Sequence, residues 1–225
     1  MDEESKVVQE VAKTTGKAID AARDFGGFIA KYISGSVEQV FGIVEDKLKY
    51  SRWERQVRLM QRADVFLKKE GLSSPTRYVP LKIMIPLLQG ATLEEDDDLQ
   101  DRWAMLLVNA ANAEFPVEIR RAYLDILEQL TALEVKILDN IYALPFAQMQ
   151  HDGVATFYLP DSVSLASPLG GSNFPAPDES IQLALGNLTR LGCLRPSMTW
   201  GGGESFGRIL PTVLGRAFIT TCRIS

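Results

Sequence analysis

The sequence contains a single histidine, His151, and only two cysteines, Cys193 and Cys222. A Cys-His or Ser-His-Asp catalytic arrangement would need that one histidine, and no second soft ligand lies near it in the sequence for zinc. We therefore predict no catalytic residue, no metal and no cofactor, and interpret His151 as an ordinary surface residue in a loop. Two cysteines also predict reduced thiols in a cytoplasmic protein, because disulfide frameworks use many more.

The chain has no run of about 18 uncharged apolar residues, the length that a membrane-spanning helix needs. The longest candidate, residues 25–44, is interrupted by Lys31 and Glu38. The opening MDEESK lacks the basic and then apolar pattern of a signal peptide. No phosphate-binding motif is present either, since Gly201 to Gly203 are not followed by Lys and Ser or Thr. A constitutive membrane span and a nucleotide-binding loop are not expected.

The net charge of −5 is distributed unevenly along the chain. Residues 1–79 carry 14 basic and 12 acidic side chains, residues 80–130 carry 4 and 10, and residues 131–225 carry 6 and 7. This asymmetry indicates charged faces that meet each other or a partner, and it argues against a generally basic nucleic-acid binder.

The first 130 residues predict a helical unit with long amphipathic helices. Apolar residues recur every three or four positions up to about residue 70, and Gly71 is predicted to end this helical region. A short helix is expected from Pro80 to Leu88. Thr92 and Glu95 have capping-box spacing, which predicts a helix over residues 93–112. Pro116 is expected to open the next helix.

Residues 131–225 predict a second, α+β domain. A second capping box, Thr131 with Glu134, predicts a helix to about Leu144. A β-like run over residues 154–159, an amphipathic helix from Asp178 capped at Gly192, two strands near 193–198 and 206–211 and a closing helix follow. This order of helices and strands resembles a winged-helix domain, an architecture that many proteins use without binding DNA.

One helix of the first unit has separate charged and apolar stripes at 100° per residue. We call the charged stripe the basic stripe; its members are Lys47, Arg55, Arg58, Arg62 and Lys69. It could be a solvated face, partly paired with the acidic residues 94–101, or a face that binds an anionic protein, nucleic acid or lipid headgroup. Asp101 is a possible partner for one of its arginines. Trp103 is interpreted as a core residue of the following helix.

A broad apolar surface is expected near the N-terminus, which one small domain would not fully cover. We call it the apolar face; it comprises Phe25, Phe28, Ile29, Tyr32 and Ile33. It predicts self-association or a membrane surface contacted on activation.

The order of residues 80–112, PLKIMIPLLQGATLEEDDDLQDRWAMLLVNAAN, is too specific for generic helix composition. It resembles the abortive-infection alpha family of bacterial phage-defence proteins, in which a P-L-K-x-x-x-P-x-L-x-G-x-x-L element precedes an L-Q-D-[KR]-W-A-x-L-L-x-N-A-A helix. The resemblance extends over about residues 41–142, and includes the LEQLTALEVKILD run from Leu127. It implies a defence role and supplies no catalytic residue.

The leading prediction is a non-enzymatic defence protein that acts through a protein partner or self-association. Two alternatives remain open. The segment of residues 25–48 could perturb a membrane, or the winged-helix-like domain could regulate by binding nucleic acid, with Arg190 on its recognition helix. Nucleic-acid binding is not favoured, because that helix has few cations and begins with Asp178 and Glu179.

Overall fold

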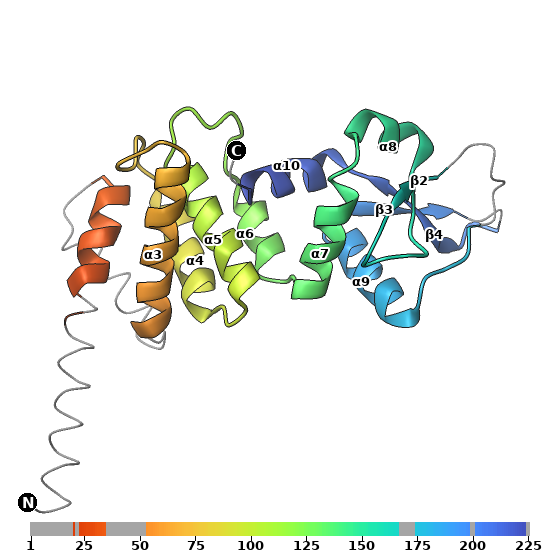
Figure 1. The fold of residues 1–225 in the computed structure, drawn as a ribbon, viewed down its shortest axis with the longest axis horizontal. Coiled ribbons are helices and arrows are strands. Elements are labelled where there is room, and N and C mark those ends of the chain that lie inside the picture. Colours follow the sequence, from red (N-terminus) through yellow and green to blue (C-terminus); the bar gives the residue numbers. More distant parts are fainter. Residues whose placement is uncertain (1–19, 21–22, 35–52, 167–173, 199–200, 224–225) are drawn as a thin grey trace, which may run out of the picture. The chain divides into compact units, whose positions relative to one another are not determined.

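The computed structural model describes residues 20, 23–34, 53–166, 174–198 and 201–223, and these are mainly helical, as predicted (Figure 1). The chain divides after Leu124 into two compact units, the second being Asp125–Arg223. The boundary falls within α6 (Arg121–Leu127). A domain division at residue 130, as expected from the sequence, remains a prediction.

Three helices form the body of the first unit: α3 (Trp53–Lys69), α4 (Leu81–Leu93) and α5 (Asp97–Ala110). They pack on one another, and residues 23–32 form a further helix in the same unit (Figure 1). The shared core contains Leu59, Ala63, Met84, Leu87, Leu88, Ala91, Trp103 and Leu107. Within the described ranges, no helix is both long and apolar enough to cross a bilayer.

The predicted end of the first helical region at Gly71 is confirmed. Gly71 has a φ of +72°, a left-handed conformation that glycine adopts without a Cβ penalty. The Leu72 N–H then donates to the Leu67 carbonyl at 2.8 Å, which satisfies one of the carbonyls left open at the end of α3.

The prediction for the start of α5 is wrong. α4 does not stop at Leu88 but continues to Leu93 with Pro86 inside it, so Thr92 lies in its last turn and its hydroxyl donates to the Leu88 carbonyl at 2.7 Å. The actual N-cap is Asp96, whose carboxylate accepts hydrogen bonds from the N–H groups of Asp98 and Leu99, both at 3.0 Å. A carboxylate at this position also interacts favourably with the helix dipole.

Of two further predicted helix starts, one is wrong and the other is confirmed. Pro116 does not begin a helix, because proline at a first helical position permits a start without imposing one, and α6 begins at Arg121. The second capping box is confirmed. Thr131 accepts from the Glu134 N–H at 3.4 Å and the Glu134 carboxylate accepts from the Thr131 N–H at 2.7 Å, at the start of α7 (Ala132–Ile141).

The second unit combines helices with a four-stranded antiparallel sheet in the order β2-β1-β4-β3. Its remaining elements are α8 (Phe146–Asp152), β1 (Val154–Ala155), β2 (Ser164–Leu165), α9 (Glu179–Arg190), β3 (Leu194–Met198), β4 (Glu204–Pro211) and α10 (Val213–Thr221). The expected strand pair and closing helix are present, while β2 and α8 were not predicted. His151 therefore lies in α8 and not in a loop, and the run 154–159 is a strand only at its first two residues. The winged-helix class remains a prediction.

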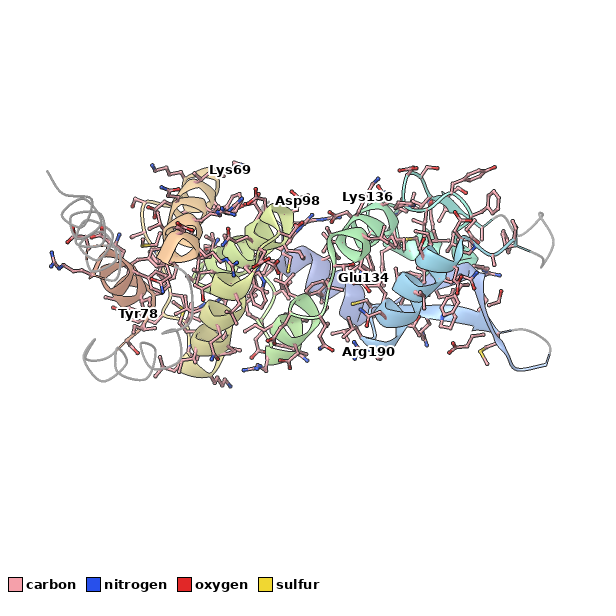
Figure 2. The ribbon with its side chains drawn as sticks, turned by 90° about the horizontal axis from the view of Figure 1, so that it is seen from below. Lys69, Tyr78, Asp98, Glu134, Lys136 and Arg190 are labelled. Carbon is pink, nitrogen blue, oxygen red and sulfur yellow. The ribbon has the colours of Figure 1, made fainter. Side chains whose placement is uncertain are left out.

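The predicted start of α9 at Asp178 is found to within one residue, since α9 begins at Glu179, and the predicted stop at Gly192 is found. Asp178 is the N-cap residue, although its side chain makes no capping hydrogen bond, and Gly192 has a φ of +75°. The buried Glu134 side chain connects α7 to α9 by accepting a hydrogen bond from Asn187 at 2.6 Å. Figure 2 labels Glu134 on α7 and Arg190 on α9, the helix that carries Asn187.

Candidate functional site

Three arginines of the basic stripe lie on α3 and contact the acidic residues that begin α5. Arg58 donates to Asp97 at 2.7 Å, and Arg62 donates to Asp97 at 3.2 Å and also to Asp101. Arg55 donates to Glu95 and to the Leu93 carbonyl, the latter at 2.8 Å. The predicted pairing of Asp101 with a stripe arginine is confirmed.

Gln100 connects this arginine-carboxylate network to the core. Its side chain is fully buried, where its oxygen accepts from Arg62 Nη1 at 2.6 Å and its amide donates to the Ala91 carbonyl at 3.3 Å. Ala91 lies in the last turn of α4, so its carbonyl has no N–H partner within that helix. Arg62 thus joins α3 to α5 through charge-assisted hydrogen bonds to Asp101 and Gln100, and the neutral hydrogen bond from Gln100 to Ala91 joins α5 to α4.

The remaining acidic side chains of the turn before α5 also have structural roles. Asp96 caps α5, and the Glu94 carboxylate accepts from the N–H groups of Glu95 and Asp96 at 2.8 and 2.9 Å. Across the described residues, no three His, Cys, Asp or Glu side chains come together in a way that could hold a metal ion.

Of the two lysines of the basic stripe, the structure describes only Lys69. Lys69 places its ammonium group 5.2 Å from the centre of the Phe66 ring, and Lys47 lies outside the described residues. An anionic partner at the basic stripe remains a prediction, and such a partner would have to displace the intramolecular carboxylates from Arg55, Arg58 and Arg62.

The apolar face is covered within the chain, contrary to the expectation that one domain would leave it exposed. Its five side chains are at most 4% exposed. Phe28 and Tyr32 pack ring to ring with centroids 4.8 Å apart, and the Tyr32 carbonyl accepts from the Val79 N–H at 2.7 Å. Burial, and then the charge of Asp64, raise the pKa of the Tyr32 hydroxyl above its usual range. Self-association or membrane contact through this face remains a prediction that would require it to open.

Trp103 is a core residue, as predicted, with 1% of its side chain exposed. It lies on the same buried side of α5 as Leu99, Leu106, Leu107 and Ala110.

The first unit also contains a groove that the sequence did not predict. Its volume is about 900 Å³, and it lies between the segment of residues 77–83 and that of residues 115–121. Four cations line it, Arg77, Lys82, Arg120 and Arg121, together with one acid, Glu118. All five are exposed, whereas Val79, Ile83 and Phe115 supply buried apolar lining.

The end of α5 holds one wall of this groove in place. The Arg77 guanidinium donates through Nε to the Ala110 carbonyl at 3.1 Å and through Nη2 to the Asn109 carbonyl at 3.4 Å. The N–H groups of Thr76 and Arg77 both donate to the Ala111 carbonyl at 2.9 Å. A cation at the C-terminus of a helix is favoured by the helix dipole. Arg77 is therefore held by the fold at the edge of the groove.

Sequence reasoning missed the groove because its two walls lie about 40 positions apart and follow no shared periodicity. One signal was available. Residues 80–130 contain only four cations, and three of them, Lys82, Arg120 and Arg121, line this groove. Lys82 and Arg120 form no ion pair with any acid in the part of the chain that the structure describes. Figure 2 shows Tyr78, at the groove, and Asp98, at the acidic start of α5, on opposite sides of this unit.

The family model described as "Abortive infection alpha" matches residues 54–222 of the chain, which is well over half of its 225 residues. The matched range includes all of α3 except Trp53, the whole groove and almost all of the described second unit. No curated protein and no solved structure matches the chain.

Proposed function

The chain belongs to the Abortive infection alpha family, and we propose that it serves abortive-infection phage defence by molecular recognition and not by catalysis. The groove between residues 77–83 and 115–121 is the surface that we propose for this recognition. Once the groove is occupied, the chain is proposed to act on a protein partner or on a second copy of itself.

One observation carries the proposal of recognition at the groove: cations converge there in a unit that is otherwise rich in acids. The carboxylates that could have served chemistry, Asp96, Asp97 and Asp101, are instead engaged in capping α5 and pairing with α3. The groove cations Lys82 and Arg120 have no such acidic partner among the described residues. An uncompensated cluster of positive charge in a concave site attracts anions.

The two rival modes have less support. A membrane-perturbing role would require the apolar face, which is buried, to become exposed. A nucleic-acid-binding role for the winged-helix-like unit would use Arg190, whose guanidinium donates to Gln129 at 3.0 Å and to Asn187 at 2.6 Å.

The test is a plaque assay on cells that express the parent chain or a variant, scored also for cell survival at high phage dose. We expect Lys82→Gln with Arg120→Gln to abolish protection at unchanged protein level, because both side chains are exposed and contribute little to folding. Lys68→Gln is the matched control, since Lys68 is an exposed helical lysine of the same unit that does not line the groove. Full protection by the double variant would contradict the assignment of recognition to the groove.

A further inference from the structure

We propose that the groove of the first unit binds a small ligand carrying two or more phosphate groups. This inference rests on the proposed function and deepens it by naming the chemistry of the ligand. It is carried by the charge of the groove, the type of its cations, its size and its surroundings.

The first argument is the type of cation and the way in which one of them is held. Three of the four cations are arginines, whose planar guanidinium forms paired hydrogen bonds to phosphate oxygens. Arg77 uses Nε and Nη2 for the carbonyls of α5, and its Nη1 forms no hydrogen bond with another described residue. Its guanidinium is thus fixed by the protein, so that less side-chain freedom is lost when an anion binds.

The second argument concerns the number of charges. Arg77 and Lys82 lie on one wall and Arg120 on the other, against the single lining acid Glu118; Arg121, also on the second wall, already interacts within the chain and is left out of this count. A ligand with one negative charge would leave part of this positive charge unneutralised. A ligand with two or more phosphates could contact both walls at once. Lys82 lies in the first turn of α4, where Pro80 supplies no side-chain cap, so the positive end of the helix dipole adds to the same field.

The third argument is size, which favours a small ligand over a polymer. A volume of about 900 Å³ is within the usual range for small-molecule sites, which is about 300–1,000 Å³. A duplex nucleic acid carries a charge about every 1.7 Å and needs a long basic surface. The opposite end of α4, about 20 Å away by helix rise, instead leads into the acidic run Glu94 to Asp98.

The fourth argument disfavours a peptide that binds as an added strand. Extended peptides commonly add a strand to the edge of a sheet, whereas acidic motifs bound by arginine clusters are tested below with poly-glutamate. All strands in the described residues belong to the second unit, so the groove offers no strand edge to pair with.

The aromatic ring of Tyr78, which is 60% exposed, lies among the groove residues. It offers a flat surface on which a ring of the ligand could stack. The phosphate groups could therefore come from a nucleotide or from an inorganic polyphosphate, two sources that share the same phosphate chemistry.

The experiment is calorimetric titration of the purified full chain with inorganic tripolyphosphate, ATP, GTP, a single-stranded DNA oligonucleotide and poly-glutamate. We expect tripolyphosphate to bind, with Lys82→Gln and Arg120→Gln each weakening its affinity about tenfold, the usual effect of losing a charged hydrogen bond. Lys68→Gln should bind like the parent. Tighter binding of ATP or GTP than of tripolyphosphate, lost in Tyr78→Ala, would identify a nucleotide; equal affinities would identify polyphosphate.

The inference is overturned if tripolyphosphate and the nucleotides fail to bind, if Lys82→Gln and Arg120→Gln bind like the parent, or if only the oligonucleotide or poly-glutamate binds. Its failure is separable from failure of the proposed function. If the double variant loses plaque protection but the parent binds no phosphate compound, the proposed ligand is rejected and the role of the groove in defence is retained. If the parent binds the phosphate compounds but the double variant still protects fully, the proposed ligand is retained and the role of the groove in defence is rejected.

Discussion

Gly90 of α4 lies directly against the indole ring of Trp103 of α5, so that a Cβ at residue 90 would overlap Cζ2 and Cη2 of the ring. Trp103 is 1% exposed and cannot move outward without opening the core. Its close packing between α4 and α5 therefore depends on glycine at position 90.

Gly90→Ala is expected to destabilise the first unit by about 1–3 kcal/mol, the usual cost of overpacking a core. The matched control is Gly27→Ala, because Gly27 is also helical and no atom lies within 4 Å of a Cβ built there. That change should stabilise by about 0.5–1 kcal/mol, since alanine is the better helix former. Urea unfolding of the two variants measures both effects. An equal stability gain in both would show that the Gly90 contact is not tight.

The Arg62–Asp101 pair is expected to contribute to stability beyond an ordinary surface ion pair. Arg62→Met should cost about 1–3 kcal/mol, because it removes a charged hydrogen bond and deprives the buried oxygen of Gln100 of its partner. Lys68→Met, the exposed control on the same helix, should change stability by less than about 0.5 kcal/mol.

A double-mutant cycle with Asp101→Asn separates the pair energy from the loss of each side chain. We expect a favourable coupling free energy for Arg62 and Asp101. Additive effects of the two substitutions would instead indicate that the pair behaves as a screened surface contact.

The second unit is expected not to bind duplex DNA at physiological salt. Residues 131–225 carry 6 basic and 7 acidic side chains, and Arg190 is held by Gln129 and Asn187, so the cation surplus that phosphate contacts need is missing. A mobility-shift assay with the full chain should show no complex. Tight, salt-sensitive binding that disappears in Arg190→Ala would contradict this prediction and favour the alternative function of a nucleic-acid-binding regulator.

Stability should fall in alkaline solution because of a buried thiol. Burial, together with the charge of Glu134, raises the pKa of Cys193 to about 12 from an ordinary value near 9. Between these pH values the unfolded chain has lost the proton and the folded chain retains it. The contribution of this thiol to the free energy of unfolding is therefore complete below about pH 9. It declines by about 1.4 kcal/mol per pH unit as the pH rises towards 12.

Urea unfolding of the parent and of Cys193→Ala, measured from pH 8 to pH 11, tests this effect. The variant should show the shallower decline. Some decline should remain in it, because burial also raises the pKa of Tyr142 to about 12, with the same sign. Identical slopes for parent and variant would show that the Cys193 thiol ionises as readily in the folded chain as in the unfolded one.

The sequence by itself determined the features that depend on neighbouring residues. The capping box of Thr131 and Glu134, the glycine stops at Gly71 and Gly192, and the apolar stripe around Trp103 all follow from local hydrogen bonding and helical periodicity. The idiosyncratic order of residues 80–112 also indicated the family. Where two local signals competed, as Thr92 and Asp96 did for the start of α5, the sequence did not determine which cap would form.

Only the tertiary structure decided which charges are neutralised. Arg55, Arg58 and Arg62 formed the most conspicuous basic pattern in the sequence, yet packing of α3 against α5 pairs them with carboxylates about 40 positions away. Lys82 and Arg120 formed no pattern, yet the fold brings them to one groove without an acidic partner among the described residues. The physical reason is that Coulomb interactions depend on distance in space and on burial, neither of which helical periodicity specifies.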